Sequence, residues 1–436
     1  MYSMDKTLPT TKLSRGKIVG KAMLKIGVKK SRQLITRSSK NDHDTEVADI
    51  IFEALGELKG VSVKIAQQVA LGMPFLPPEY LDKIEKSFSQ IPTINKALVR
   101  KIIKTEFGVY PHELFDSFEM QAFGSASLGQ VHKALKDGNS LAVKVQYPGI
   151  KKSIQTDMSL IHFGLKRFAK GKNVDHIIEE ISDRLYEEID YELEAKNCDY
   201  FRKNNKNSQI VIPKVYHENS TQKVLSSTFI KGLDFQTFLT SSPSQEQINS
   251  YAQLIFDNFY DSLYTLKAIH ADPNPGNFIF LEDGKLALID FGCVKKIDEE
   301  FLSSYTALHL DLIAGVDDEV LSKHYQKLGM IEEDTQEKML HFYQEVIKPL
   351  DRLYIEPLRD TTYDFSIHKD FSKRGFEAIF EVQKKQFHSV HQVNEEFIFL
   401  DRTLLGYYAL FEKMGAKIDT TYVKNLIKEY QNAKNA

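Results

Sequence analysis

The chain has 436 residues, which exceeds a typical single domain and predicts either two to three units or one large two-lobed body. Hydrophobic residues at 42% and charged residues at 27% indicate a globular protein with a sizeable core, and the net charge of −3 gives no global signal for nucleic acid. The two cysteines, Cys198 and Cys293, have the spacing of neither a disulfide framework nor a metal site, which favours a reducing compartment.

The amino-terminal segment is strongly basic. Residues 6–40 contain eleven Lys or Arg and no Asp or Glu. Such a segment forms a surface for anionic lipid headgroups or another acidic partner, or else a solvated arm. The first residues lack the apolar core of a secretory signal, and no run of about 18 apolar residues occurs anywhere. We therefore expect a cytoplasmic protein, with any membrane contact made peripherally at the inner face.

Helical patterns follow the basic segment. From His43 to Gly72, apolar residues recur at steps of three and four, which predicts an amphipathic helix ended by Gly72 and Pro74. "LPPEYLDKIEKSF" and "INKALVRKIIKTEFG" predict two more helices, the second ended by Gly108. Residues 1–110 are therefore predicted to form a basic segment and a helical extension.

Short strands are predicted from about Phe115 onward. "FDSFEMQAF", "GQVHKAL" and "LAVKVQY" are typical of three strands, the last two joined by a turn around Asp137-Gly138. A helical stretch follows, and then "IVIPKVYHE" and "KVLSSTFI" predict two more strands. Residues 111–235 are thus predicted to form an amino-terminal lobe, a sheet with inserted helices.

The remaining residues, 236–436, are predicted to form a helical carboxy-terminal lobe. Ser244 and Gln247 fit a capping box at the start of a long helix. "NFIFL", "EDG" and "KLALI" predict a small hairpin that ends at Asp290. The fold class expected from these elements is α+β, with two lobes and a helical extension.

The most specific chemical signal is the stretch "HADPNPGNFIFLEDGKLALIDFG", residues 270–292. Phosphoryl transfer needs cations near the phosphates and oxygen ligands for Mg²⁺, and Asn277 and Asp290 are the expected metal ligands. Asp272 precedes Asn277 by the five residues that separate the loop aspartate and asparagine of kinases, where the aspartate orients or deprotonates the acceptor. His270 is expected to buttress the loop. The same residue types also favour simple turns.

The earlier strands supply the other parts of such a site. Lys144, in "LAVKV", is expected to reach the α- and β-phosphates, and Glu194 is the carboxylate expected to hold it, although an isolated strand lysine is more often only solvated. The segment "FGSASLGQVHKA" occupies the position of a Gly-rich phosphate-covering loop. The loop residues expected at the nucleotide, with Gly129 behind them, are Gly124, Ser125, Ala126 and Ser127.

In this order the motifs resemble the UbiB/AarF-type atypical kinases, a group associated with coenzyme Q biosynthesis. The resemblance spans about residues 45–300 and rests on Lys64 to Gln67, "GSAS", "LAVKVQYPGI", "EEIDYELEAKN", "HADPNPGN" and "DFG". It implies a protein-kinase-like fold and ATP and Mg²⁺ as cofactors. It also implies that the extension, with Lys64 and Gln67, covers the nucleotide site, and that Glu188 and Asp190 bind Lys64 or a second cation there.

The activity implied by the resemblance is a Mg-dependent kinase or ATPase acting on water or a small molecule, in isoprenoid-quinone or other membrane-lipid metabolism. Two alternatives remain: a nucleotide-gated protein that binds a lipid or a complex without turnover, and a small-molecule kinase similar to aminoglycoside phosphotransferases. The chain departs from the family pattern at three places: Ala66 replaces a signature glycine, Gly124 and Ser125 replace alanines, and Asn274 replaces a histidine. The nucleotide preference is therefore left open.

Overall fold

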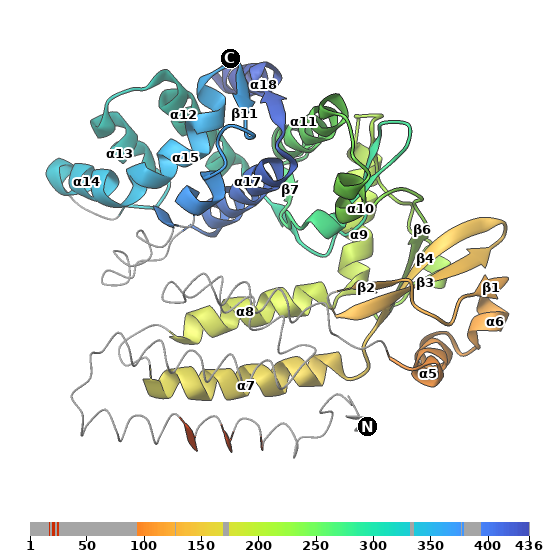
Figure 1. Cartoon of the computed structure of the whole chain (residues 1–436). Coiled ribbons are helices and arrows are strands. Elements are labelled where there is room, and N and C mark those ends of the chain that lie inside the picture. Colours follow the sequence, from red (N-terminus) through yellow and green to blue (C-terminus); the bar gives the residue numbers. More distant parts are fainter. Residues whose placement is uncertain are drawn as a thin grey trace. The chain divides into compact units, whose positions relative to one another are not determined.

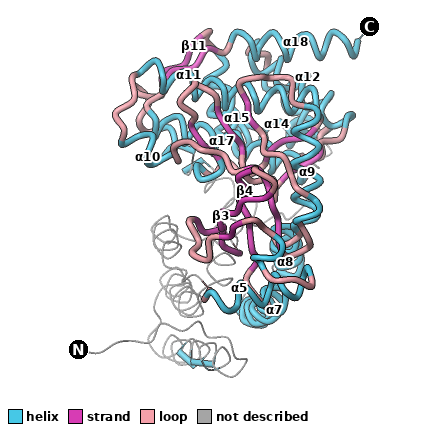
Figure 2. The backbone as a smooth tube through the Cα atoms, turned by 90° about the vertical axis from the view of Figure 1, so that its right-hand side faces the viewer, coloured by secondary structure: helices cyan, strands magenta, loops and turns pink. Residues whose placement is uncertain are grey.

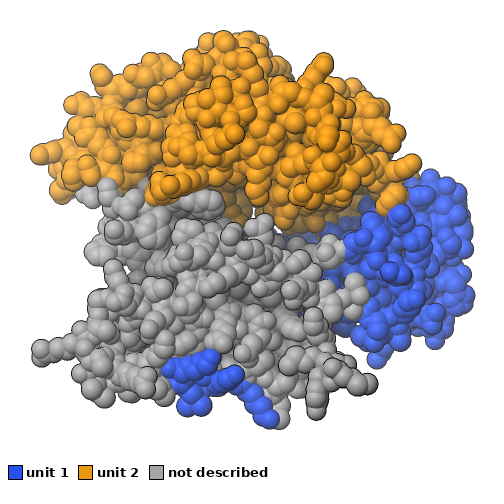
Figure 3. All heavy atoms as spheres, in the orientation of Figure 1, with its two compact units in different colours: residues 1–193, 216–227 blue, residues 194–215, 228–436 orange. Residues whose placement is uncertain are grey.

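The structure, a computed structural model, forms two compact units, which Figure 3 draws in blue and orange. Unit 1 comprises Met1–Leu193 and Tyr216–Ser227, and unit 2 comprises Glu194–Val215 and Thr228–Ala436. The described residues are 17, 20, 21, 24, 25, 94–126, 128–168, 174–331, 335–375, 377–378 and 394–435.

Several sequence predictions fall outside the described residues. The first two predicted helices of the extension do so, and with them Lys64, Ala66 and Gln67. Ser127 of the expected phosphate-covering loop and most of the basic segment, residues 6–40, do so as well. The roles expected for these residues stay predictions.

Unit 1 is built on a five-stranded sheet with the strand order β1-β3-β4-β6, in which β2 also pairs with β3. β3 (Gly129–Lys136) and β4 (Asn139–Gln146) form the predicted hairpin. Asp137 and Gly138 join them with φ angles of 48° and 74°, the left-handed pair that matches the twist of a two-residue hairpin. The outer strands are β1 (Ser117–Phe118), β2 (Gly124–Ala126) and β6 (Val224–Thr228).

The strand predicted for "FDSFEMQAF" is confirmed only in part, because within this segment β1 alone pairs with β3, and the short β2 begins directly after it. The amide of Glu119 donates to the carbonyl of Lys133, and the amide of Phe123 donates to that of Val131. The four residue steps from Glu119 to Phe123 therefore span the same length of the sheet as the two steps from Lys133 to Val131 in β3. The extra residues must bulge out of the ladder, as they do wherever two strands differ in length between shared hydrogen bonds.

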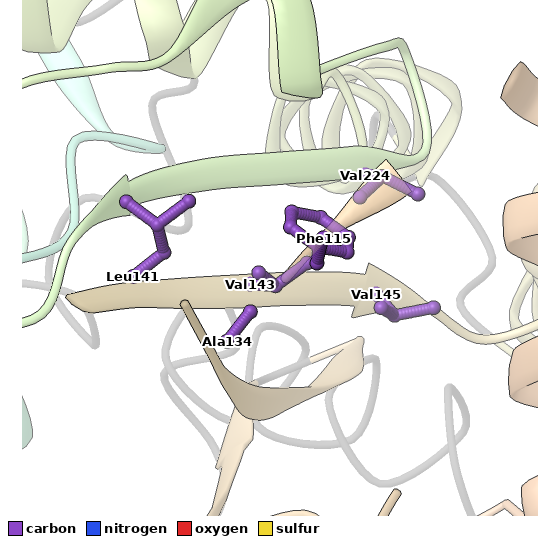
Figure 4. Close-up of a cluster of buried hydrophobic side chains, with 6 residues drawn as sticks. All are labelled: Phe115, Ala134, Leu141, Val143, Val145 and Val224. Carbon is purple, nitrogen blue, oxygen red and sulfur yellow. The ribbon is translucent and has the colours of Figure 1, made fainter. Parts of the chain in front are cut away.

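One face of the sheet forms the core of unit 1 (Figure 4). Leu141, Val143 and Val145 alternate along β4 and are fully buried, in a cluster with Phe115, Ala134 and Val224. Helix α5 (Lys96–Phe107) packs on this cluster through partly buried Ile102 and Phe107. It ends at Gly108, in the left-handed conformation with φ of 76°, as the sequence predicts.

Three helices follow the sheet hairpin. Helices α7 (Ile150–Phe168) and α8 (Val174–Glu188) pack against each other and run side by side in Figure 1. Helix α9 (Tyr191–Asn204) begins in unit 1 and continues into unit 2. Its start is fixed by Asp190, whose Oδ1 accepts the amides of Glu192 at 3.1 Å and Leu193 at 3.0 Å.

Unit 2 is mainly helical, as the predominance of cyan among its elements in Figure 2 shows. Helix α11 (Gln245–Asp261) begins with the predicted capping box between Ser244 and Gln247. β8 (Phe278–Phe280) and β9 (Leu286–Leu288) form the predicted hairpin. The strand predicted for "IVIPKVYHE" is divided: β5 (Ile210–Val211) pairs in parallel with β9, whereas Lys214 and Tyr216 are hydrogen-bonded to the backbone of β6. Pro213, two residues after the end of β5, has no backbone N–H to donate to the β5–β9 pairing, which limits the length of β5.

The remaining elements complete the two units. In unit 1 they are α6 (Pro111–Leu114) and η1 (His217–Asn219). In unit 2 they are α10 (Phe235–Thr240), η2 (Ser262–Leu266), β7 (Ala268–His270), η3 (Pro275–Asn277), β10 (Val294–Lys296), α12 (Glu299–Ala314), α13 (Asp318–Lys327), α14 (Gln336–Phe342), η4 (Tyr343–Ile347), α15 (Lys348–Arg359), β11 (Thr362–Asp364), α17 (Glu395–Met414), β12 (Lys417–Asp419) and α18 (Thr421–Asn435). None of the described helices combines the length and apolarity that a membrane span requires.

Side chains of α11 form hydrogen bonds with the outer edge of β12, where a neighbouring strand would otherwise pair. Within the described part of the chain, β12 pairs with β11 alone, so its outer edge has no strand partner there. Asn249 accepts the amide of Lys417 at 2.8 Å, and Gln253 accepts the amide of Asp419 at 2.7 Å and donates to its carbonyl at 2.9 Å. Because residues four apart share a helix face, one helix satisfies successive backbone groups of the strand edge.

Candidate functional site

Lys144 lies on the face of β4 opposite the core of unit 1. Its neighbours Val143 and Val145 are fully buried in that core, and side chains alternate between the two faces of a strand. The Nζ of Lys144 lies 5.5 Å from the centroid of the Tyr191 ring, within the range of a cation–π contact. Tyr191 is 2% exposed, so its ring is a fixed support for the lysine.

The expected phosphate-covering loop is a tight hairpin at the end of the sheet. Gly124, Ser125 and Ala126 form β2, which pairs with the start of β3 so that Ala126 lies opposite Gly129. A Cβ atom at Gly129 would lie 2.6 Å from the Val145 carbonyl oxygen and 2.7 Å from the Tyr191 hydroxyl. Gly129 therefore permits a close approach that other residues exclude.

Gly124 differs from Gly129 in this respect. A Cβ atom at Gly124 would meet only the Cβ of Val131, at the ordinary contact distance of 3.9 Å, and the backbone there is a regular strand. Nothing in the described surroundings requires a glycine at position 124. The reason for this departure from the family pattern therefore does not lie in the packing of the loop.

The two acidic residues of "EEIDYELEAKN" lie at a junction between helices. Glu188 is the last residue of α8, and Asp190 caps the start of α9. The backbone between them is held by Gln146 of β4, whose Nε2 donates to the carbonyl of Ile189 at 2.7 Å. Lys64, the expected partner of this pair, lies outside the described residues, so the predicted cation-binding role is not tested.

In unit 2, Asp272 and Asn277 are joined by hydrogen bonds. The Nδ2 of Asn277 donates to Oδ2 of Asp272 at 3.0 Å and to its carbonyl oxygen at 3.2 Å. Asn277 is 8% exposed, so its side chain is held in one orientation. Because both amide hydrogens are used in this way, the Oδ1 of Asn277 is the side-chain atom left for a cation.

Asn274 explains how the turn between these residues is formed. Its Oδ1 accepts the amide of Gly276 at 2.8 Å and caps the short helical turn η3, and its carbonyl accepts the amide of Asn277 at 3.0 Å. Its own amide donates to Oδ1 of Asp272 at 3.2 Å. The residue in place of the family's histidine is thus a turn-forming residue that connects the expected catalytic aspartate with the expected metal ligand.

His270 connects this loop with the segment "DFG". Its Nε2 is hydrogen-bonded to the carbonyl of Asp290, and its ring lies edge-on to Phe291 with centroids 5.5 Å apart. The carbonyl of Asn277 accepts the amide of Ile289 at 3.1 Å. The expected buttressing role of His270 is therefore confirmed, and the two predicted metal ligands lie on adjacent, hydrogen-bonded segments.

Helix α9 packs on the "DFG" segment from within unit 2. Asn197 donates to the carbonyl of Phe291 at 3.1 Å, and Glu194, one turn earlier on the same face, is 3% exposed. A Cβ atom at Gly292 would lie 3.2 Å from Oδ1 of Asp290 and 3.9 Å from Oε2 of Glu194. Glu194 therefore lies near the segment that carries Asp290, an expected metal ligand. Its pairing with Lys144, which belongs to unit 1, stays a prediction.

The donor set suits a hard cation. Asp290 provides carboxylate oxygens, of which Oδ1 accepts the Gly292 amide at 2.9 Å, and Asn277 provides an amide oxygen. Magnesium keeps several waters and needs few protein ligands, so one carboxylate and one amide are sufficient. Among the described residues, no group of three or more His, Cys, Asp or Glu side chains gathers as an alternative metal site.

A profile of the ABC1 atypical kinase-like domain matches residues 86–324, more than half of the chain. The chain belongs to the ABC1 atypical kinase-like family. This confirms the UbiB/AarF resemblance of the sequence motifs. The match includes Lys144, Glu194, Asp272, Asn277 and Asp290.

Three relatives illustrate the likeness, and two of them carry aarF in their names. The chain is 29% identical over 323 residues to an uncharacterized protein of Synechocystis sp., covering 70% of this chain and 79% of that protein. It is 33% identical over 285 residues to an uncharacterized, chloroplastic aarF domain-containing protein kinase of Arabidopsis thaliana, covering 64% and 40%. It is 29% identical over 288 residues to AarF domain-containing kinase 1 of Drosophila melanogaster, covering 62% and 54%. The chain thus spans about half or less of the length of the latter two relatives.

A solved structure confirms the predicted mixed α+β kinase-like fold. Rv3197 from Mycobacterium tuberculosis, solved as a complex with erythromycin, aligns with a TM-score of 0.62 and 24% identity. The alignment covers 90% of this chain and 98% of that protein. At this identity the likeness concerns the fold alone.

Sequence reasoning missed some of the residues that hold the site. Tyr191 lies within a motif quoted for its acidic residues, and Asn197 lies one helical turn after Glu194, so helical spacing offered a signal for Asn197. Tyr407, whose hydroxyl lies 3.2 Å from the carbonyl of His270, is more than a hundred residues from that loop and had no signal at all.

Proposed function

We propose that this ABC1-family protein binds Mg-ATP and transfers its terminal phosphoryl group to water or to a small molecule. The observation that carries the proposal is the connected loop pair of unit 2. Asp272 and Asn277 are bonded to each other, and His270 and Asn277 are each bonded to the segment that carries Asp290. If these residues only formed turns, the loop that carries Asp272 and Asn277 would not need to be hydrogen-bonded to the segment that carries Asp290.

Each residue has a proposed role. Asn277 and Asp290 would hold Mg²⁺, which neutralises charge on the phosphates when bound. Asp272 would orient the attacking hydroxyl or water through its carboxylate, which the side chain of Asn277 and the amide of Asn274 hold in place. Lys144, supported by Tyr191, would contact the phosphates, with Glu194 as its proposed partner.

The metabolic setting is the finer part of the proposal. We propose a role in isoprenoid-quinone or membrane-lipid metabolism, with peripheral contact of the basic residues 6–40 with anionic lipid. The support is the motif resemblance and the charge of this segment. A nucleotide-gated binder without turnover is the alternative, since the same loops could hold Mg-ATP as a switch.

The metal dependence of nucleotide binding tests the proposal. ATP with Mg²⁺ should raise the melting temperature of the purified protein, and either component alone should raise it much less. Asp290→Asn should abolish the Mg-dependent part and lower ATP hydrolysis at least about 100-fold, as expected when a metal-held charge is lost from phosphoryl transfer. Asp283→Asn, in the exposed turn of the β8–β9 hairpin, is the matched control and should behave as wild type. A wild-type response of Asp290→Asn would refute the proposed site.

Turnover separates the two candidate functions. We expect ATP hydrolysis by the full-length protein that vesicles of anionic phospholipid stimulate more than vesicles of neutral phosphatidylcholine. A nucleotide-induced rise in melting temperature, with no hydrolysis under either condition, would favour the binder. Removal of residues 1–40 should lower flotation with anionic vesicles, and undiminished flotation would exclude this segment as the lipid contact.

A further inference from the structure

Helix α17 (Figure 1) contacts the loop that carries Asp272, although it lies beyond residues 86–324, which the family profile matches. The contact is made at Gly406. A Cβ atom there would lie 2.2 Å from Cγ and 2.7 Å from Cβ of Pro273, the residue directly after Asp272. Such distances are far inside van der Waals contact, so position 406 accepts no side chain unless the loop moves.

The atoms of Pro273 cannot rotate out of the way. Its ring is closed on its own backbone nitrogen, so a change of ring pucker can shift Cγ but not Cβ, and relieving the contact with Cβ means moving the backbone next to Asp272. Glycine is also unfavourable inside a helix relative to alanine, because it loses more conformational freedom on folding. The contact with Pro273 gives a physical reason for a glycine at position 406, well within α17.

The next residue of the helix holds the other side of Asp272. The Tyr407 hydroxyl donates to the carbonyl of His270 at 3.2 Å. Tyr407 is 4% exposed, with its ring against Phe278 and Phe259 at centroid distances of 6.2 and 5.7 Å. Burial, and secondarily the nearby Asp272 and Cys293, raise the pKa of Tyr407, so its hydroxyl remains a donor at neutral pH.

Helix α17 is itself fastened to elements next to the site. Oε1 of Glu396, in its first turn, accepts the amide of Asp298 at 2.6 Å, immediately before α12. The centroid of the Phe399 ring lies 4.9 Å from Nζ of Lys295. Lys295 belongs to β10, which pairs with β7, the strand that ends at His270. The helix and the loop therefore share a rigid support.

We propose that Gly406 and Tyr407 are positioning residues that fix the backbone on both sides of Asp272, so that α17 acts as a template for the catalytic loop. The consequence for turnover rests on the proposed function. The geometric part, that α17 holds the loop in place, does not depend on it.

The test compares three variants of the full chain. Gly406→Ala introduces the clash with Pro273, and Tyr407→Phe removes the hydroxyl at nearly constant volume. Gly375→Ala is the matched control, because Gly375 is also helical and a Cβ atom there would meet only Cδ2 of Leu405 at 3.9 Å. Amide hydrogen exchange of peptides covering residues 268–280 reports loop opening directly.

We expect exchange in these peptides to be about tenfold faster in Gly406→Ala and about fivefold faster in Tyr407→Phe, as one lost buried hydrogen bond implies. Exchange in Gly375→Ala should match wild type. For ATP hydrolysis, kcat should fall at least about tenfold in Gly406→Ala while KM for ATP changes less than about threefold, since a displaced Asp272 affects the transition state more than nucleotide binding. A general loss of structure would instead raise exchange everywhere.

The outcomes distinguish this inference from the proposed function. Wild-type exchange in both Gly406→Ala and Tyr407→Phe would overturn the positioning role, whatever the activity. Faster loop exchange in a protein whose wild type hydrolyses no ATP would support the template and count against the proposed turnover. If Gly406→Ala does not fold, Tyr407→Phe decides: local exchange confined to residues 268–280 supports the inference, and unchanged exchange refutes it.

Discussion

Replacing Asp351 by asparagine should remove a pH-dependent penalty from the stability of unit 2. Asp351 lies in α15, is 4% exposed and accepts a hydrogen bond from the Tyr325 hydroxyl. Burial raises the pKa of Asp351 from 3.8 to about 7, although the hydroxyls of Tyr325 and Tyr343 lower it in part. The folded protein therefore keeps a proton that the unfolded chain has already released at intermediate pH.

The sign and size of the effect follow from proton linkage. Because the folded pKa is the higher one, stability is fully present below about pH 4 and is lost as pH rises to about 7. At about 1.4 kcal/mol per unit, a shift of roughly three units is worth about 4 kcal/mol. An asparagine side chain cannot ionise. The free energy of unfolding of Asp351→Asn minus that of wild type should therefore be up to about 4 kcal/mol larger at pH 8 than at pH 4.

Urea unfolding of both proteins at half-unit steps from pH 4 to pH 8 measures this difference. We expect the free energy of unfolding of Asp351→Asn minus that of wild type to rise by about 1.4 kcal/mol per pH unit within the window and to level off above pH 7. Asp183→Asn, at an exposed position of α8, is the control and should give a flat difference. A flat difference for Asp351→Asn as well would show that Asp351 ionises normally in the folded protein, contrary to this reasoning.

Two further predictions concern the loops of the candidate site. Gly129→Ala should lower the melting temperature and weaken Mg-ATP binding at least about tenfold, because the added Cβ meets the Val145 carbonyl and the Tyr191 hydroxyl. Gly124→Ala should leave the melting temperature and Mg-ATP binding unchanged. Equal effects of the two substitutions would show that packing at Gly129 is not the cause. Asn274→Ala should cost about 1 kcal/mol of cap energy and slow ATP hydrolysis, and Asn274→Asp, which keeps an acceptor for the Gly276 amide, should retain most of both. Denaturant unfolding and steady-state kinetics measure these effects, and equal losses in the two Asn274 variants would exclude the capping role.

Local features of the fold could be read from the sequence because their causes are local. The Asp137-Gly138 turn and the Ser244 capping box depend on the conformational preferences and short hydrogen bonds of adjacent residues, and both occur as predicted. The hairpin that leads to Asp290 was predicted for the same reason. The motif order also predicted the family and the kinase-like fold, since few other proteins need this set of residues at this spacing.

Predictions that needed a partner far along the chain were less successful. The segment around Met120 and Gln121 has the composition of a strand, but the hydrogen bonds of Glu119 and Phe123 to β3 leave it bulged. The segment predicted as one strand from Ile210 is divided, because β5 pairs with β9, more than seventy residues further along the chain, and only the part around Lys214 and Tyr216 is hydrogen-bonded to β6. Strand pairing depends on which edges meet after folding, and hydrophobic periodicity carries no record of that choice.

The candidate site divides in the same way. The sequence alone indicated Asp272, Asn277 and Asp290, because the chemistry of Mg²⁺ and phosphate restricts the residue types that can serve. Only the tertiary structure showed that Gly406 and Tyr407 lie on either side of Asp272. A glycine and a tyrosine in an apolar helix look like ordinary packing residues, because a contact between backbone segments more than a hundred residues apart leaves no periodic pattern in either segment.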